Sequence, residues 1–434
     1  MSNYNLTLSD DKNIWIIFCF IAVVFFICQH DLLHSTNMVE KGLSTTEEIV
    51  SSTEQGSLKR QAALLSLGVF AFFSLMRRTR HPLKINGLLG WVIIFYVVWS
   101  GLSIFWADDF SLTFKRVFTL AIFSLAALAV AERLTWHQIF LLIIFCGLLY
   151  MGIGFCAEIA LGTFRPFNSE YCFSGTMDAN VGSWGLGIMI IAAVFLTVDS
   201  QRGRTFFLTI ILVSLIALIL NKTRTTFGAV IIALIIYGGL NSSNLIKMVS
   251  ATLLTMVLYI SYFLLDERLL VNAWKIFMLG KEDSTLTLTG RIPVWKECFS
   301  FIQARPFFGY GYNAFWTAKH VRQISDKADW GIAGVPWALN GYIDLALGVG
   351  LVGLAAYMLL LILALKEAIV SYSRTGNSLY LSIFAMLIFY VVVSFLESLP
   401  YNAGYATFIF FTILAKLAFG DKENDYGELD YESS

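Results

Sequence analysis

Charged side chains are scarce in this 434-residue chain: 14% of its residues are charged, whereas 57% are hydrophobic, and the mean hydropathy is +0.71. Soluble domains carry roughly 25% charged residues, so this composition predicts an integral membrane protein. The formal net charge is +0, and such a balance gives no indication of nucleic acid as a partner.

Metal-binding motifs are missing as well. The six cysteines and five histidines are scattered, with no CxxC or HExxH pattern, so we expect neither a zinc nor a haem site and no cofactor. We also expect no cleavable leader, because the first apolar run, 14–28, follows an acidic, polar start and lacks a small-residue cleavage site. We therefore expect this run to stay in place as a membrane helix.

Apolar runs long enough to cross a bilayer recur along the whole chain. They predict an all-α polytopic protein of about twelve transmembrane helices, with approximate spans 13–28, 61–76, 86–106, 117–134, 136–161, 181–198, 205–220, 226–240, 245–265, 341–365, 378–396 and 403–419. The predicted organisation has four parts: nine helices within 1–265, a large loop over 266–340, three helices within 341–420 and an acidic tail over 421–434.

Basic residues in the short loops set the predicted orientation. Cytoplasmic loops are enriched in Lys and Arg, and alternating helices bring one such set to a single side: Arg77, Arg78, Arg80, Lys84, Arg202, Arg204, Lys366 and Arg374. We therefore expect both termini in the cytoplasm and the large loop outside it. Cys172 and Cys298 would both lie outside, where a disulfide between them is an open alternative.

The large loop contains the most informative polar stretch, 286–315. Alternation over 284–289 favours a short extended segment, and Thr289 with Gly290 offers a helix N-cap before Pro293. The following apolar spacing predicts an amphipathic helix on the membrane surface, with its stripe formed by Ile292, Trp295, Phe299 and Ile302.

Three cations at the outer side suggest an anion site. Arg291 falls in the first turn of the predicted surface helix, where free N–H groups and a guanidinium suit a phosphate or diphosphate. Lys222 and Arg224 occupy a tight turn between two apolar helices, against the positive-inside pattern. We expect the three to converge on one anion; the alternative is that they reach into lipid headgroups.

Several motifs occur in a fixed order over about 100–370. They are 103–109 (SIFWADD) with Lys115 and Arg116, 178–180 (DAN), 222–226 (KTRTT), 287–295 (TLTGRIPVW), 304–316 (ARPFFGYGYNAFW), 340–344 (NGYID) and 348–353 (GVGLVG). In order and spacing this set resembles the O-antigen ligase and polymerase superfamily, and its wording is most similar to the ExoQ-type exopolysaccharide polymerases.

The resemblance implies a GT-C-like glycosyltransferase of the bacterial cytoplasmic (inner) membrane, with its active site facing the periplasm. Its implied partners are an undecaprenyl-diphosphate-linked oligosaccharide, an acceptor glycan, membrane lipid and, for a polymerase, a chain-length regulator. Arg224 and Arg291, with Lys222 in support, match the arginines that hold the diphosphate in the family. Without a metal ion, these fixed cations would stabilise the charge of the leaving group.

The sequence departs from the family at the general base. Many members carry a histidine directly before the Asn-Gly-Tyr segment, where this chain has Leu339, and a second family histidine is replaced by Asp178. A sugar hydroxyl needs a proton acceptor within hydrogen-bond reach, so we predict Asp344 as the base, with Asp178 as a further catalytic candidate. Asp344 could equally complement its helix dipole. Other outward-facing candidates are Glu158, Glu397 and His320.

The motif residues complete the predicted substrate site, because their side chains could contact the diphosphate or the glycan: Trp295, Arg305, Tyr310, Tyr312, Asn340 and Tyr342. Aromatic residues in this loop either stack on sugar rings or anchor the loop at the membrane interface. Gly309 and Gly311 favour tight turns and lack the strand and helix of a nucleotide-binding loop.

Three functions compete. The first is a polymerase that joins lipid-linked repeat units, and the second is a ligase that moves finished glycan to lipid A core or protein. The third is a transporter of lipid-linked sugars, which usually shows related halves with broken helices near the midplane. We find no internal repeat, so transport is the weakest prediction, and the motif wording favours the polymerase.

Overall fold

A computed structural model describes residues 12–34, 57–77, 84–168, 171–200, 203–241, 288–328, 337–401 and 403–420. Within these ranges the regular elements are all helices, as expected from the sequence, and no strand occurs. The predicted span 245–265, the loop over 35–56 and the acidic tail lie outside the described residues, as do parts of the large loop.

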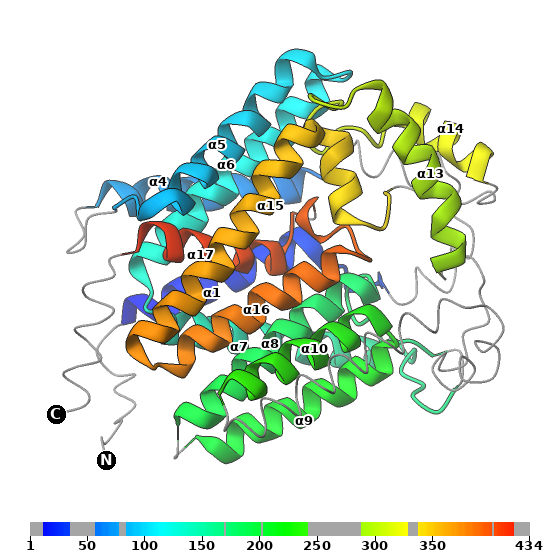
Figure 1. The fold of residues 1–434 in the computed structure, drawn as a ribbon. Coiled ribbons are helices and arrows are strands. Elements are labelled where there is room, and N and C mark those ends of the chain that lie inside the picture. Colours follow the sequence, from blue (N-terminus) through cyan, green and yellow to red (C-terminus); the bar gives the residue numbers. More distant parts are fainter. Residues whose placement is uncertain are drawn as a thin grey trace.

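Within the described ranges, eleven apolar helices form a bundle (Figure 1). They are α1 (Lys12–Gln29), α4 (Leu58–Met76), α5 (Gly87–Leu102), α6 (Phe110–Arg133), α7 (Trp136–Ala160), α8 (Ala179–Asp199), α9 (Arg204–Asn221), α10 (Arg224–Leu240), α15 (Gly341–Thr375), α16 (Ser378–Ser394) and α17 (Tyr405–Phe419). Seven are long and apolar enough to cross a membrane, and α1, α10, α16 and α17 are shorter apolar helices. The chain is a multi-pass membrane protein.

The predicted spans match these helices except at a few ends. The span predicted over 117–134 begins at Phe110, because the Asp109 carboxylate accepts a hydrogen bond from the Leu112 N–H and caps the helix earlier. The span predicted over 341–365 continues to Thr375, where Gly376 ends it in the left-handed conformation. The span over 86–106 finishes in a 3-10 turn, η1 (Ser103–Trp106).

The core lies along α8, α16 and α17, whose side chains are mostly buried on every side. Such all-round apolar helices are typical of a bundle interior. The outer helices α4, α5 and α9 instead expose large apolar side chains, among them Phe72, Trp91 and Leu212. In a polytopic protein these faces meet lipid rather than water.

Helix α15 is broken at Gly350, which has φ 71° and ψ −179°. Residues 305–311 fill the break: the Tyr310 and Gly311 N–H groups donate to the carbonyls of Leu347 and Gly348 (2.8 and 2.9 Å), and the Leu351 N–H donates to Pro306 (2.7 Å). The Trp99 indole N–H caps the Val349 carbonyl at 2.9 Å. Backbone groups freed inside a membrane protein must find such partners.

Two helices, α13 (Leu288–Ala304) and α14 (Ala318–Ala328), lie together at one end of the bundle (Figure 1). We call this end the outer end. A small second core joins them to the first turns of α15, and its main members are Val294, Cys298, Ile302, Tyr310, Phe315, Ile324 and Leu347. The outer layer is thus packed onto α15.

The predicted surface helix exists, but its predicted cap is wrong. It begins no later than Leu288, so Thr289 and Gly290 are helical residues and not its cap. The stripe buried against the protein is Val294, Cys298 and Ile302, whereas Ile292 and Phe299 are more than half exposed. The helix has apolar residues on two faces, and the sequence pattern could not show which one contacts the protein.

Candidate functional site

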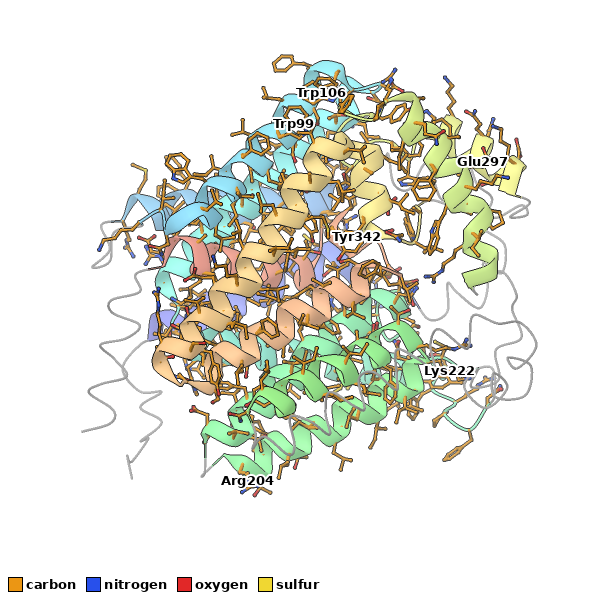
Figure 2. All side chains as sticks on the ribbon, viewed as in Figure 1. Trp99, Trp106, Arg204, Lys222, Glu297 and Tyr342 are labelled. Carbon is orange, nitrogen blue, oxygen red and sulfur yellow. The ribbon has the colours of Figure 1, made fainter. Side chains whose placement is uncertain are left out.

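The turn between α9 and α10 is firmly built. The Asn221 amide donates to the carbonyls of Phe173 and Ala179 (2.8 and 2.9 Å), and the Phe173 N–H donates to Leu220 (2.9 Å). Lys222 caps α9 in the left-handed conformation, with φ 56°, and Arg224 is the first residue of α10. The turn therefore holds both cations at a fixed place beside the 171–178 segment, at the opposite end of α9 from Arg204 (Figure 2).

Arg291 is 9% exposed and reaches across to the end of α16. One guanidinium nitrogen donates to the Leu396 carbonyl at 2.6 Å, while its Nε–H is buried without a hydrogen-bond partner. Burial lowers the pKa of this guanidinium, and Glu397 opposes that effect. A buried cationic donor with an unused N–H is suited to an anionic ligand.

Glu397 is the carboxylate that shares this neighbourhood. It is 4% exposed and follows α16, and its charge interacts with both Arg291 and Asp178. The pKa of the Glu397 carboxyl is raised to about 7: burial is the main cause, Arg291 acts against it, and the like charge of Asp178 adds a smaller increase. Arg291, Glu397 and Asp178 thus come together from three separate parts of the chain.

Asp178 has a second task in this arrangement. As the N-cap of α8, its carboxylate accepts a hydrogen bond from the Asn180 N–H at 2.9 Å. The predicted catalytic candidate is therefore an exposed cap residue, and its charge makes a small contribution to the raised pKa of Glu397.

Asp344, the predicted base, lies in a different environment. One carboxylate oxygen accepts hydrogen bonds from the Trp316 indole at 2.8 Å and from the Ala338 N–H at 3.1 Å, and the side chain is 2% exposed. The other oxygen is buried beside Ser398 with no partner within hydrogen-bond geometry. These contacts tie the loop around Trp316 to α15, which is a structural task.

Three other predicted substrate residues hold the same region together. The Trp295 indole donates to the Ala338 carbonyl at 2.8 Å. The Asn340 side chain caps α15 by accepting hydrogen bonds from the Tyr342 and Ile343 N–H groups, and the Tyr342 hydroxyl donates to the Val391 carbonyl at 3.0 Å. In this state their polar atoms are occupied by the protein itself.

Arg305 and Tyr310 also have protein partners. Arg305 bonds Asp108 at 2.5 Å and lies 4.7 Å from the centre of the Tyr310 ring. The Tyr310 hydroxyl donates to the Phe301 carbonyl at 3.0 Å. These contacts fasten the end of α13 to the turn before α6. Tyr312 is buried farther in, with its N–H bonded to the Ser103 hydroxyl at 2.9 Å.

The other candidate bases are held by the protein as well. Glu158 is 1% exposed and accepts hydrogen bonds from the Tyr171 hydroxyl and the Ser174 and Gly175 N–H groups. His320 is stacked on Phe315 and bonded to its carbonyl at 2.7 Å, and burial lowers its pKa. Glu158 therefore organises the 171–178 segment, and His320 belongs to the core of the outer layer.

The described part of the chain contains no disulfide and no candidate metal site. Cys172 and Cys298 are free thiols, so the disulfide considered from the sequence is not formed. Among the residues that the structure describes, no group of three His, Cys, Asp or Glu side chains could hold a metal ion.

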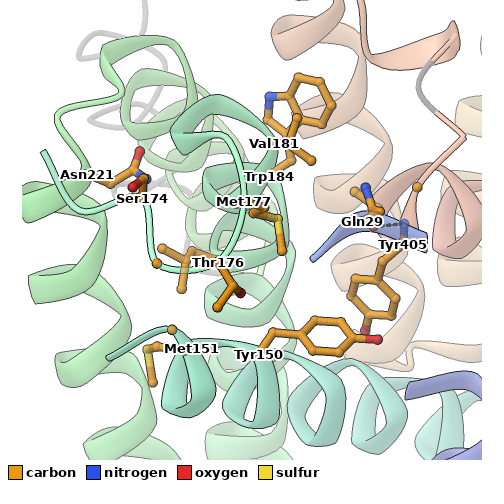
Figure 3. Close-up of a pocket in the computed structure, with 18 of the residues that line it drawn as sticks. Gln29, Tyr150, Met151, Ser174, Thr176, Met177, Val181, Trp184, Asn221 and Tyr405 are labelled. Carbon is orange, nitrogen blue, oxygen red and sulfur yellow. Dashed lines mark hydrogen bonds between the residues drawn. The ribbon is translucent and has the colours of Figure 1, made fainter. Parts of the chain in front are cut away.

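A hollow lies beside the 173–177 segment, between α7, α8 and the start of α17 (Figure 3). Its empty space, mouth included, is about 680 Å³, and aromatic side chains from the helices line it: Tyr150, Trp184 and Tyr405. The Trp184 indole N–H is buried without a partner. Asn221 and Met177 also line the hollow, so it adjoins both the α9–α10 turn and Asp178.

A comparison with known protein families gives one match. Residues 209–358 match the family model described as O-Antigen ligase. This match supports the resemblance to the O-antigen ligase and polymerase superfamily that the motifs indicate. The match covers α9, α10, α13, α14 and the first half of α15, and therefore includes Lys222, Arg224 and Arg291. A comparison with curated proteins gives no significant match.

The match supports an O-antigen ligase- or polymerase-type membrane enzyme. Sequence reasoning singled out Arg291 and Asp178, and it included Glu397 only among the alternatives. Glu397 follows Leu396, whose carbonyl accepts a hydrogen bond from Arg291. That contact joins residues 105 positions apart, so no local sequence pattern could have placed Glu397 ahead of the other candidate bases. The aromatic hollow was not predicted, because Tyr150, Trp184 and Tyr405 lie in ordinary apolar runs.

Proposed function

We propose that this enzyme polymerises oligosaccharide repeat units carried on undecaprenyl diphosphate, at the periplasmic face of the cytoplasmic membrane. The observation that carries the proposal is the meeting of Arg291 and Glu397 at the outer end of the bundle. A buried cation with an unused donor and a carboxylate whose pKa is about 7 are the two groups that a metal-independent glycosyl transfer requires.

In the proposed reaction Arg291 binds the donor diphosphate, and Lys222 and Arg224 add positive charge from the neighbouring turn. The bond between the donor sugar C1 and the diphosphate oxygen breaks, and undecaprenyl diphosphate leaves with the electron pair. An acceptor hydroxyl oxygen forms the new bond to C1 while Glu397 takes its proton. Burial, with a smaller contribution from Asp178, raises the pKa of Glu397 to about 7, so that the proton can be passed on to solvent after transfer.

The hollow beside the 173–177 segment suits a sugar of the transferred glycan. Aromatic rings offer faces on which sugar rings can stack, and the unpartnered Trp184 indole N–H offers a donor for a hydroxyl or carbonyl oxygen. Because Met177 lines the hollow and Asp178 follows it, a sugar bound there would lie next to the proposed reacting groups.

The runner-up is a ligase that uses the same donor and a different acceptor. The polymerase is favoured by the motif wording over 287–312 and by the lack of the ligase-like histidine at Leu339. The transporter is disfavoured because the break in α15 is filled by residues 305–311 and presents no open helix ends to a cargo.

Gene deletion in the host, followed by size analysis of the extracted glycans, tests this proposal. A polymerase predicts single repeat units, both on undecaprenyl diphosphate and at the cell surface, with long chains missing. Complementation with Arg291→Ala should leave the same defect, whereas Lys319→Ala, a change at an exposed cation of the outer layer, should restore long chains. Long chains stranded on undecaprenyl diphosphate would instead identify a ligase.

A further inference from the structure

The aromatic hollow contains a hydrogen-bond donor that the protein does not use, the indole N–H of Trp184 on α8. The Trp184 side chain is 4% exposed, and its Nε1 is buried without a partner. Of the described residues that line the hollow (Figure 3), only Trp184 has a buried side-chain polar atom left unpaired. A buried donor without an acceptor destabilises a protein and needs an explanation. A ligand that brings an acceptor supplies one.

Other polar side chains around the hollow already bond to the protein. Gln29 Oε1 accepts a hydrogen bond from the Tyr405 N–H at 2.7 Å, and the Thr176 hydroxyl is bonded to His30 Nδ1 at 2.6 Å. The Asn221 amide donates to two backbone carbonyls. A hydroxyl group both donates and accepts hydrogen bonds, whereas a carbonyl oxygen only accepts them. The single unused donor therefore favours a carbonyl oxygen as its partner.

The enclosed part of the hollow is small. Its cavity volume is about 60 Å³, far below the roughly 300–1,000 Å³ of sites that enclose a whole small molecule. A sugar ring can stack at the mouth, and only a substituent of a few atoms can enter. Ordered water is a poor occupant, because a buried water needs about three polar partners and the lining leaves one buried donor unpaired.

Apolar atoms and a glycine form the wall beside the donor. The apolar lining residues include Met151, Phe173, Met177 and Val181. Gly185 follows Trp184 and also lines the hollow, and a Cβ added to Gly185 would meet no atom within 4 Å. The space beside Gly185 is therefore part of the hollow. A methyl group gains from burial against such a wall, whereas a polar group loses its hydration there.

We infer that the hollow binds an acetyl group carried by a sugar of the glycan, with the carbonyl oxygen on the Trp184 indole N–H and the methyl group beside Gly185. N-acetylated and O-acetylated sugars share this group. The inference rests on the proposed function, which brings a glycan to this segment. Met177 lines the hollow and Asp178 follows it, so the acetylated sugar lies near the proposed reacting groups. The hollow thus selects repeat units that carry an acetyl group at this sugar.

Saturation-transfer NMR on the full-length enzyme in lipid nanodiscs provides the test. The probes are the methyl glycosides of N-acetylglucosamine and N-acetylgalactosamine, their O-acetylated analogues, and methyl glucoside and galactoside without an acetyl group. We expect the acetyl methyl protons of a bound probe to receive the strongest saturation. Trp184→Phe should raise the Kd of that probe by about two- to tenfold, the worth of one neutral hydrogen bond. Gly185→Ala, which puts a methyl group into the cavity, should raise it by about tenfold or more.

Gly152→Ala is the matched control, because Gly152 is a helical glycine of α7 whose added Cβ would also meet nothing within 4 Å, and it does not line the hollow. This variant should keep the wild-type Kd. A wild-type enzyme that does not prefer acetylated probes would overturn the inference, as would an unchanged Kd in Gly185→Ala or an equal loss in Gly152→Ala. A preference for acetylated probes in an enzyme whose deletion leaves long chains intact would instead defeat the proposed function alone.

Discussion

Two buried carboxylates, Asp344 and Glu397, show how the same residue type takes different tasks in this protein. Asp344 spends one oxygen on the Trp316 indole and the Ala338 N–H. Glu397 has Arg291 and Asp178 as its charged neighbours. One Asp344 oxygen accepts hydrogen bonds from the fold and the other is buried beside Ser398, whereas Glu397 lies beside the cation proposed to hold the diphosphate, so we take Glu397 as the base.

Glu397→Gln should lower kcat by about 10²–10⁴-fold, the usual worth of a general base. The base acts when it is deprotonated, and its pKa is about 7, so the wild-type kcat should rise with pH through neutrality and level off above it. A pH profile of kcat in reconstituted vesicles measures both effects, and the variant's profile should be flat. A wild-type profile that falls with rising pH would contradict this role.

Asp178→Asn should move that profile. The negative charge of Asp178 raises the pKa of the Glu397 carboxyl, so its removal stabilises the ionised form of Glu397. The midpoint of the kcat profile should therefore shift to lower pH, while the α8 cap survives because Asn also caps helices. An unchanged midpoint with reduced kcat would mean that Asp178 acts on the substrate and not on Glu397.

Asp344→Asn tests whether Asp344 has a structural role and not a catalytic one. Loss of charge-assisted hydrogen bonds to the Trp316 indole and the Ala338 N–H should lower the stability of the folded protein by about 1–3 kcal/mol. Thermal unfolding of the detergent-solubilised enzyme reports this as a lower Tm, and the pH midpoint of the remaining activity should match the wild type. A kcat loss equal to that of Glu397→Gln at an unchanged Tm would restore Asp344 as the base.

At the residue scale the sequence singled out polar residues but could not predict their contacts. Arg291 was singled out from its motif and its place in a helix, and it proved to be a buried cation with an unused donor. We predicted the motif residues Asn340, Tyr342 and Arg305 as substrate-binding residues because they lie in motifs shared with the family. Their hydrogen bonds join segments that are far apart in the chain, and no local pattern predicts such partners.

At the scale of elements, the break in α15 is the feature that the sequence concealed. Apolar periodicity continues through Gly350, and a glycine inside an apolar run is common in membrane helices. What decides the break is the docking of residues 305–311 against it, which lies about 40 positions away in the sequence. The predicted spans were otherwise sound, because hydropathy alone defines them.

Gly350→Ala should therefore be far more damaging than Gly376→Ala. At Gly350 a Cβ would lie 2.1 Å from the Phe307 carbonyl oxygen, and the backbone conformation is one that essentially only glycine adopts. At Gly376 the φ is also positive, but nothing lies within 4 Å, so the cost is about 1–2 kcal/mol. Fluorescence size-exclusion chromatography with a thermal ramp should show loss of folded protein for the first and a modest Tm decrease for the second.

Equal behaviour of the two alanine variants would mean that the docked segment moves away from α15 without harm. In that case residues 305–311 would contribute little to the fold, and the break would have another cause.

On the scale of the whole molecule, the positive-inside rule predicts how the protein is oriented in the membrane, and labelling can test this orientation. The basic loops predict the α13 end outside the cytoplasm. Lys319→Cys, on exposed α14, should react with a membrane-impermeant maleimide in intact cells that have a permeable outer layer. Gly376→Cys, at the opposite end of α15, should react only after the cytoplasmic membrane is opened. The reverse labelling pattern would show that the orientation is inverted and that the proposed site faces the cytoplasm.

The length of α13 sets the distance between its two fastened ends. Fourteen residues separate Arg291 from Arg305, about 21 Å at 1.5 Å per residue, and the two ends are fastened to Leu396 and Asp108. The helix thus acts as a strut between the end of α16 and the turn before α6, and it holds Arg291 at a fixed place above the bundle.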